Sequence, residues 1–209
     1  LARILPAMAG FDDSLVREYF ELNGFLTRRP SKPTGGARGR GTEEPGDLQI
    51  INPRPRPGAE PPFQLFGADL AGLTAATVAI KGLTTGKSLT PAMLRRGDFL
   101  EFIRKEAGPA AKESFAPASA PTGGEPVAAR LLVLPGLPAQ EPARSESIAL
   151  LRAQGVDHVL TFRTILENLA QRAEGGAGES ATLRLLRLLQ AYDMVNAAQL
   201  ELFGQPPSK

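Results

Sequence analysis

The chain has 209 residues, no cysteine and a single histidine, His158. It therefore has no disulfide framework, no zinc–thiolate site, no cysteine nucleophile and, within one chain, no multi-histidine metal site. No apolar run approaches the ~18 residues of a membrane span, and residues 1–8 are too short and too interrupted for a signal peptide. We expect a soluble cytoplasmic protein that has no membrane partner.

Positive charge is concentrated in the first half of the chain. Residues 1–105 contain 15 Lys and Arg against 11 Asp and Glu, whereas residues 106–209 contain 9 against 11. Within the first half, cations gather in two stretches that lack acids, at 28–40 and 81–96. Such stretches are either solvated loops or a surface that faces phosphates, and the sequence alone leaves both interpretations open.

The first predicted elements are a helix and three strands. Asp12-Asp13-Ser14 opens an amphipathic helix that Asn23-Gly24 closes, because acids in the first turn favour the helix dipole and glycine ends a helix. The alternating segment 25–29 predicts a short strand. Residues 47–51 predict a second strand, and the β-branched run 75–81 predicts a third.

Helices and strands alternate in the rest of the chain. Thr90-Pro91 supplies an N-cap followed by proline at the first helical position. After this helix the sequence predicts a strand, a helix, a strand and two helices, at 129–134, 142–154, 156–162, 163–174 and 179–199. Two segments rich in Pro and Gly, 30–46 and 107–126, are expected to be mobile loops. The order of elements predicts an α/β protein with a mixed central sheet flanked by helices, folded as a single domain over residues 1–209.

Two isolated features favour structural roles. One stripe on the last helix is expected to be core rather than partner surface, and it consists of Leu185, Leu189, Tyr192 and Val195. His158 lies in an apolar strand beside Asp157, and we expect it to be a structural histidine rather than a catalytic one.

Asp47 and Lys81 fall where two neighbouring strands would place a metal-dependent hydrolytic site. Asp47 opens the second predicted strand, and Lys81 ends the third. Mg²⁺ prefers oxygen ligands, and a lysine near the attacking water or the scissile phosphate assists phosphodiester hydrolysis. Because alternate residues of a strand share a face, a second metal-binding acid is expected two residues before Lys81. That position is Ala79, whose methyl group cannot bind a metal.

Over residues 12–105 the chain resembles the PD-(D/E)xK, or restriction-endonuclease-like, nuclease superfamily. The resemblance rests on a leading helix with Glu18, a strand that runs from Gly24-Phe25 to Arg28-Arg29, Asp47 opening the next strand and Ile80-Lys81-Gly82 closing the third. It implies a restriction-endonuclease-like fold in which Asp47 binds the metal, Lys81 assists the water or the phosphate, and Glu18 supports the site. It also implies Mg²⁺ as the cofactor if the protein is active.

Three explanations of Ala79 remain open. The fold has lost catalysis and kept a binding or structural role, or the missing acid comes from another element, with Glu101 and Glu18 as candidates. In the third explanation the match is accidental, and Asp47 and Lys81 are ordinary residues at strand ends. A single carboxylate binds Mg²⁺ weakly, so we expect no efficient hydrolysis.

The function that follows is nucleic-acid binding by a catalytically impaired nuclease fold, with DNA as the expected partner. The residues expected to contact it are basic: Arg28, Arg29, Lys81, Lys87, Arg95 and Arg96. One alternative is a Mg²⁺-dependent DNA endonuclease with a relocated acid, and another is a non-catalytic structural or protein-interaction subunit. A homodimer is compatible with each of these functions.

Overall fold

The structure, a computed structural model, describes residues 9–29, 48–56, 58, 60–81, 89–97, 99–101, 128–176 and 179–194. The two loops predicted at 30–46 and 107–126 lie outside the described residues. The chain divides into two compact units, Leu1–Ile165 and Leu166–Lys209. The prediction of a single domain over the whole chain stays a prediction.

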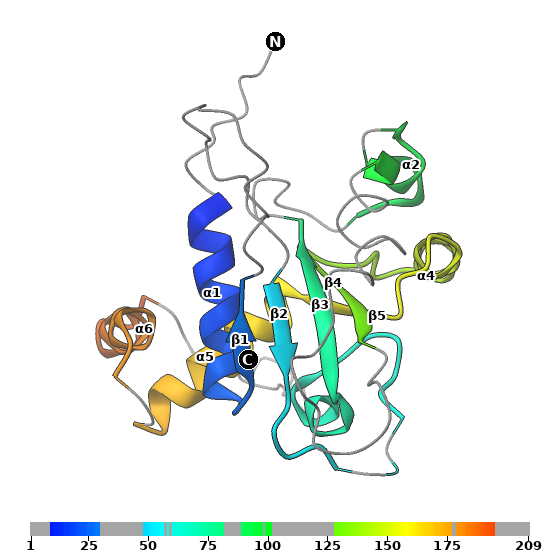
Figure 1. Cartoon of the computed structure of the whole chain (residues 1–209). Coiled ribbons are helices and arrows are strands. Elements are labelled where there is room, and N and C mark those ends of the chain that lie inside the picture. Colours follow the sequence, from blue (N-terminus) through cyan, green and yellow to red (C-terminus); the bar gives the residue numbers. More distant parts are fainter. Residues whose placement is uncertain are drawn as a thin grey trace, which may run out of the picture. The chain divides into compact units, whose positions relative to one another are not determined.

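The first unit is built on a five-stranded mixed sheet with the strand order β1-β2-β3-β4-β5 (Figure 1). The strands are β1 (Leu26–Arg28), β2 (Leu48–Ile51), β3 (Ala75–Ile80), β4 (Ala129–Leu134) and β5 (His158–Thr161). β2 is antiparallel to both β1 and β3, whereas β4 and β5 continue the sheet in parallel with β3. The end of the sheet where β3, β4 and β5 finish and β2 begins is called the upper end here, and the opposite end is the lower end.

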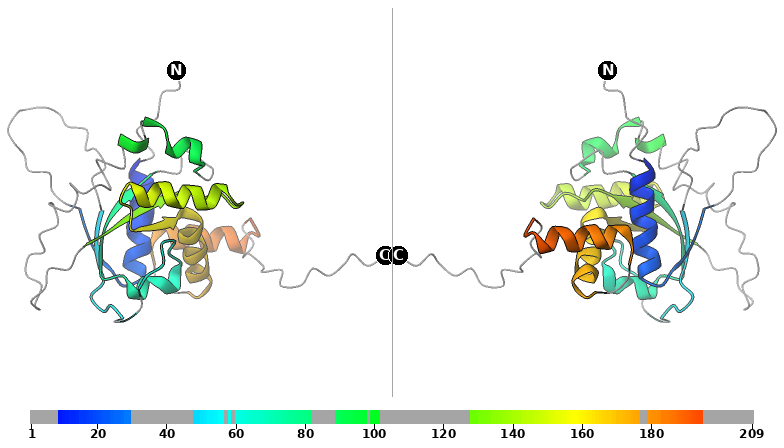
Figure 2. Two further views of the ribbon diagram at one scale, coloured as in Figure 1. Left: turned by 90° about the vertical axis from the view of Figure 1, so that its right-hand side faces the viewer. Right: turned by 90° about the vertical axis from the view of Figure 1, so that its left-hand side faces the viewer.

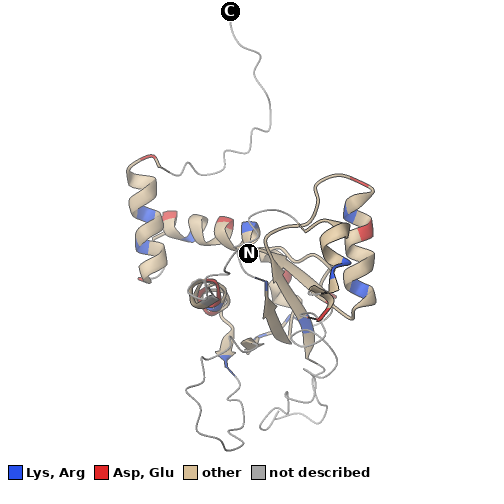
Figure 3. Ribbon diagram, turned by 90° about the horizontal axis from the view of Figure 1, so that it is seen from above, with Lys and Arg blue, Asp and Glu red and all other residues tan. Residues whose placement is uncertain are grey.

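Helices lie on both faces of this sheet. α1 (Ala9–Leu22) packs against β1 and β2, as the side views show (Figure 2). α2 (Pro91–Leu94) and α4 (Ala143–Ala153) pack against each other on the opposite face (Figure 3). A short 3-10 helix, η1 (Gly67–Gly72), precedes β3, and α5 (Phe162–Glu174) follows β5 directly. The predicted α/β class with a mixed sheet and flanking helices is confirmed.

α1 buries one regular stripe of side chains. Val16, Tyr19 and Phe20 recur at the three- and four-residue spacing of a single helix face, and none of them is exposed. The rings of Tyr19 and Phe20 meet edge to face at 5.3 Å, and Phe20 meets Phe25 in the same way at 5.4 Å. Gly24, with a φ of +85°, provides the left-handed turn after the helix. Burying each large apolar side chain contributes about 1.5–3 kcal/mol, so apolar contact holds α1 on the sheet.

The other face of the sheet carries an apolar core beneath α2 and α4. Ala79, Leu132 and Val159 stand in register across β3, β4 and β5, so their side chains share this face. Leu94 of α2 and Leu151 of α4 belong to the same cluster. All five side chains are at most 2% exposed.

Local signals explain several boundaries in this unit. The hydroxyl of Thr90 accepts a hydrogen bond from the N–H of Met93, so the predicted N-cap of α2 is confirmed.

The chain just before η1 covers the outer edge of β5, because Leu65 N–H donates to Val159 O at 2.8 Å and Val159 N–H donates to Phe63 O at 2.7 Å. The N–H and the carbonyl of Val159 on this edge are therefore paired within the fold.

The second unit contains most of α5 together with α6 (Ala181–Ala191). Arg187 donates from Nε to the carbonyl of Ala173 at 3.0 Å, and Gln190 donates from Nε2 to the carbonyl of Ala170 at 3.2 Å. Two side chains of α6 therefore hydrogen-bond to backbone carbonyls of α5, which holds these two helices together. No helix in the described part of the chain is both long and apolar enough to cross a bilayer.

The prediction that the leucine stripe of the last helix is core is wrong for two of its members. Leu185 is 54% exposed and Tyr192 is 72% exposed, while Leu183 is fully buried. α6 carries leucines on more than one side, so spacing alone does not decide which of them faces α5. The helix predicted at 179–199 ends at Ala191 in the structure, and residues 195–199 lie outside the described residues.

Candidate nucleic-acid interface

Lys81 lies at the upper end of the sheet, directly after β3. Its N–H donates to the carbonyl of Val133 at 2.9 Å, which continues the β3–β4 ladder by one residue. The side chain is half-buried, and its Nζ lies 5.8 Å from the centre of the Phe99 ring. A cation over an aromatic face is attracted by the ring quadrupole, so Phe99 helps to fix the position of the ammonium group. No local pattern predicts this contact, because the two residues are 18 positions apart in the chain.

Ala79 lies in the apolar core and not in an open site. Its side chain is 2% exposed and belongs to the cluster that contains Leu132 and Phe99. On β3 it shares a face with Lys81, because the two residues are two apart in an extended chain. A carboxylate at this position would be buried among apolar side chains, where an unpaired charge costs several kcal/mol. Residue 79 is therefore a packing position in this structure.

The metal site implied by the resemblance is not formed by the described residues. Asp47 lies outside them, so its role as the metal ligand stays a prediction. Leu48, its neighbour, is opposite Val78, which brings the start of β2 and the end of β3 to the same end of the sheet. Within the described ranges, no three His, Asp or Glu side chains form a group that could hold a metal ion. The described side chains do not fit a Mg²⁺ site, and they support no metal-dependent step.

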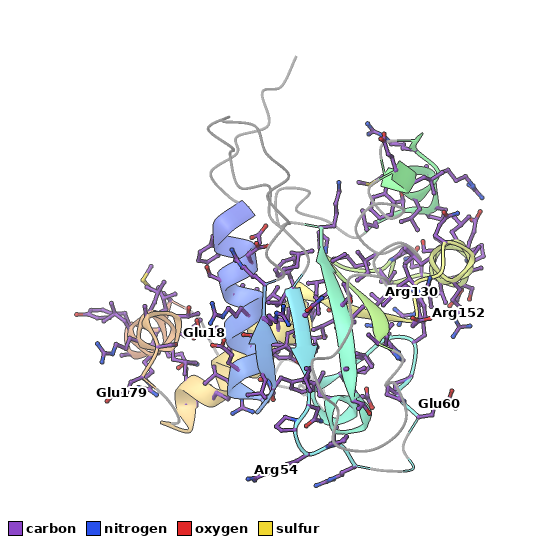
Figure 4. All side chains as sticks on the ribbon, viewed as in Figure 1. Glu18, Arg54, Glu60, Arg130, Arg152 and Glu179 are labelled. Atoms are coloured by element: carbon purple, nitrogen blue, oxygen red, sulfur yellow. The ribbon has the colours of Figure 1, made fainter. Side chains whose placement is uncertain are left out.

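The two candidate helper acids lie in different surroundings. Glu18 is two residues from Val16 and two from Phe20, which places it about 200° around α1 from each of these buried side chains. Figure 4 shows Glu18 on the side of α1 that faces away from the strands. Glu101 is exposed and follows Phe99 by two residues in a short helical stretch. The structure does not bring Glu18 to Lys81, and the roles predicted for both acids stay predictions.

Carboxylates neutralise part of the predicted basic surface. Arg29 forms an ion pair with Asp13 of α1 at 3.2 Å. Arg95, after α2, forms an ion pair with Glu146 of α4. The sequence of α4 contains both acidic and basic residues, which the ribbon colours show from above (Figure 3). Paired arginines offer less charge to a phosphate, because a ligand must first compete with the carboxylate.

Arg28 and Arg96 are the other predicted contacts that the structure describes, and both are exposed. Arg28 ends β1 opposite Gln49 of β2, and Gln49 lies opposite Thr77 of β3. Side chains that are paired in register point to the same face, so these three residues form a polar row across the antiparallel half of the sheet. Lys87 lies outside the described residues.

The start of α1 contains an acidic pair whose burial the sequence interpretation missed. Asp12 and Asp13 are 2% and 7% exposed. Burial raises the pKa of Asp13, Arg29 lowers it and the neighbouring Asp12 raises it again, so that the pKa lies above its ordinary value of 3.8. The signal was present, because Asp12 precedes the buried Val16 by four residues and so lies on the apolar stripe of the helix.

The charged residues at the starts of β4 and β5 have a structural role. Arg130 donates from Nε and Nη2 to the two carboxylate oxygens of Asp157 at 3.1 Å each, and its own N–H donates to Asp157 at 2.8 Å. Burial raises the pKa of Asp157, but the hydrogen bonds and charge of Arg130 outweigh burial and hold it below its ordinary value.

His158 Nδ1 lies 3.0 Å from the carbonyl of Pro62, to which it donates. This contact agrees with the structural role expected for His158.

No protein-family model, no curated protein and no solved structure matches this chain. The class of protein that the observations define is an α/β protein with a five-stranded mixed sheet flanked by helices. Its function has to be argued from the residues at the ends of that sheet.

Proposed function

We propose that this protein binds nucleic acid through the upper end of a restriction-endonuclease-like sheet and does not hydrolyse it. The observation that carries the proposal is the contrast between two residues of one strand face. Lys81 is half-buried at the end of β3, while Ala79, where the resemblance implies a metal-binding acid, is packed in the apolar core. The cation of the implied site is present, and the second carboxylate is not.

The topology of the first unit supports the fold part of the proposal. α1 precedes three antiparallel strands, and β4 adds to β3 in parallel after the α2 segment. The resemblance rests on this order of elements, and it implies that the residue at the end of the third strand assists the water or the phosphate. β3 and β4 are parallel, so both strands end at the upper end of the sheet. Lys81, which follows β3 directly, therefore lies at that end.

The charges at the upper end support the binding part. Arg28 is exposed, and no described residue pairs with its guanidinium group. A phosphate backbone is attracted by such a group and by the ammonium of Lys81, with release of counterions from the nucleic acid. Arg29 and Arg95 contribute less in this proposal, since Asp13 and Glu146 neutralise them.

The test measures the affinity of the full chain for labelled single- and double-stranded DNA over a series of salt concentrations. We expect affinity to fall steeply with salt, and Lys81→Ala and Arg28→Ala each to reduce the slope of log K against log salt by about one. Arg152→Ala is the matched control, because Arg152 also lies over a phenylalanine ring, at 4.7 Å from the centre of Phe63, but on α4. The control is expected to leave the slope unchanged.

Other outcomes separate the alternatives. Absence of salt-dependent binding, or an equal loss in the Arg152→Ala control, would reject the proposed interface and favour a structural or protein-interaction subunit. Nicking of supercoiled plasmid by the natural protein with Mg²⁺, abolished by Glu101→Gln, would instead select an endonuclease with a relocated acid.

A further inference from the structure

A second feature of the first unit is a pocket of about 560 Å³ at the lower end of the sheet. Three segments line it: the turn after α1 (residues 23–25), the chain after β2 (residues 52–54) and the η1 region (residues 67, 70 and 71). β2 ends at the lower end of the sheet, where β3 begins, whereas Lys81 follows β3 at the upper end. The pocket is therefore remote from Lys81. The pocket therefore belongs to a different part of the molecule from the proposed nucleic-acid interface.

Backbone hydrogen bonds fix the walls of this pocket. Asn52 N–H donates to the carbonyl of Thr74 at 2.8 Å, and Arg56 N–H donates to the carbonyl of Ala71 at 2.8 Å. The side-chain oxygen of Asn52 accepts from the N–H of Arg54 at 2.9 Å, which makes a tight turn after β2. A cavity whose walls are already ordered costs little conformational entropy when a ligand enters.

The lining combines apolar walls with polar donors. Phe25 and Leu70 are buried at 4% and 3% exposure, and Pro53 adds a third apolar side chain. Since the oxygen of Asn52 is engaged by Arg54 N–H, its amide nitrogen is the group that it can offer to a ligand. No described residue pairs with the guanidinium of Arg54, which Figure 4 shows on the chain after β2. None of the described lining residues is acidic.

We propose that this pocket binds a small organic anion. Its apolar body would lie against Phe25, Pro53 and Leu70, and Arg54 and the Asn52 amide would hold its anionic group. The volume lies within the range of about 300–1,000 Å³ found for small-molecule sites. A guanidinium group suits both carboxylate and phosphate oxygens, so an aromatic carboxylate and a phosphomonoester share the required chemistry.

The experiment is a calorimetric or NMR titration of the full chain with four probes: AMP, 1-naphthoate, adenosine and inorganic phosphate. We expect AMP or 1-naphthoate to bind with a Kd below about 1 mM, and adenosine and inorganic phosphate to bind at least ~10-fold more weakly. The anion that binds identifies the source as a phosphate ester or a carboxylate. Binding of neither anion at up to about 5 mM would overturn the proposal.

Two substitutions of neighbouring arginines distinguish the pocket from general surface charge. Arg54→Gln should weaken the bound anion about 10-fold, because a hydrogen-bonded charge is lost. Arg56→Gln is the matched control, since Arg56 is an exposed arginine two residues later and does not line the pocket. Equal weakening by both substitutions would reject the site.

Ala71→Trp tests the same pocket by filling it. The enlarged side chain should remove binding while Arg54 stays in place, and unchanged far-UV circular dichroism would show that the fold is retained. Binding of undiminished strength in a folded Ala71→Trp variant would also reject the site. DNA binding is measured separately, so failure of this inference and failure of the proposed interface are distinguishable.

Discussion

The aspartates of the two arginine–aspartate pairs at opposite ends of the sheet have pKa values shifted in opposite directions, although the arginine lowers the pKa in both pairs. At the upper end Arg29 makes one contact of 3.2 Å with Asp13, and burial dominates, so the pKa of Asp13 is raised. At the lower end Arg130 contacts both oxygens of Asp157 and adds a backbone N–H, and the pKa of Asp157 is lowered. Hydrogen bonds to the charged carboxylate lower its pKa and desolvation raises it, so the balance of these two effects decides the direction of the pKa shift.

The same comparison bears on ligand binding at the two ends. At the upper end, Asp13 and Glu146 neutralise two of the predicted basic residues, and Phe99 contacts Lys81. At the lower end, no described residue pairs with the side chains of Arg54 and Arg56. A count of basic residues along the chain therefore overstates the charge available at the upper end and misses the charge at the lower end.

The largest expected effect comes from restoring the implied acid at the upper end. Ala79→Glu should lower the free energy of unfolding by at least about 3 kcal/mol, because it buries an unpaired charge in a packed core. Urea denaturation of the full chain measures this loss. Thr74→Glu is the control, since Thr74 is exposed just before β3 and should change stability by less than about 0.5 kcal/mol. A loss below about 1 kcal/mol for Ala79→Glu would mean that residue 79 opens onto a site that accepts a carboxylate.

A smaller effect is expected at the lower end. The pKa of Asp157 is lowered in the folded state, so its charge stabilises the fold above the unfolded pKa and this contribution is lost as pH falls through the folded pKa. Asp157→Asn should cost about 1 kcal/mol at neutral pH, and the difference from the natural protein should shrink as pH falls below about 4. Urea denaturation at several pH values measures it, with the exposed Glu60→Gln as control. A difference that does not change with pH would show that the lost packing, not the ion pair, matters.

The smallest effect is expected for Asp13. Its raised pKa means that its contribution to stability is present below the ordinary value of 3.8 and is lost as pH rises through the folded pKa. Asp13→Asn should therefore change stability by less than about 1 kcal/mol at neutral pH, since removal of a buried charge offsets loss of the Arg29 pair.

Arg29→Met sharpens the test of Asp13. Without the one charge that lowers the pKa of Asp13, the loss of stability between acid and neutral pH should become larger than in the natural protein. Thermal unfolding over the same pH range measures both variants. A smaller loss in Arg29→Met would show that burial does not govern this carboxylate.

Much of the fold could be predicted from particular local patterns. The amphipathic helix closed by Asn23-Gly24, the Thr90-Pro91 helix start and the strand predicted at 129–134 each correspond to an observed element. The sequence was less informative where the local pattern did not specify one structure. α6 has leucines on more than one side, and the residues before β3 form a 3-10 helix that has no strong periodicity.

The candidate site was less predictable than the fold. Lys81 could be identified as a residue at a strand end, but its contact with Phe99 and the burial of Ala79 could not, since both depend on helices that pack on the sheet from elsewhere in the chain. The acidic pair at residues 12 and 13 suggested a helix start, but α1 already begins at Ala9 and both acids are buried.

The sequence by itself determined the α/β class, the order of the main helices and strands, and the ends of the strands to within two residues. These follow from periodicity and capping, which act over a few neighbouring residues. Only the tertiary structure decided that residue 79 is core, that Arg29 and Arg95 are paired, and that the turn after α1, the chain after β2 and the η1 region enclose a pocket. Each of these depends on contacts between segments far apart in the chain, and burial, charge pairing and cavity shape arise only when those segments pack together.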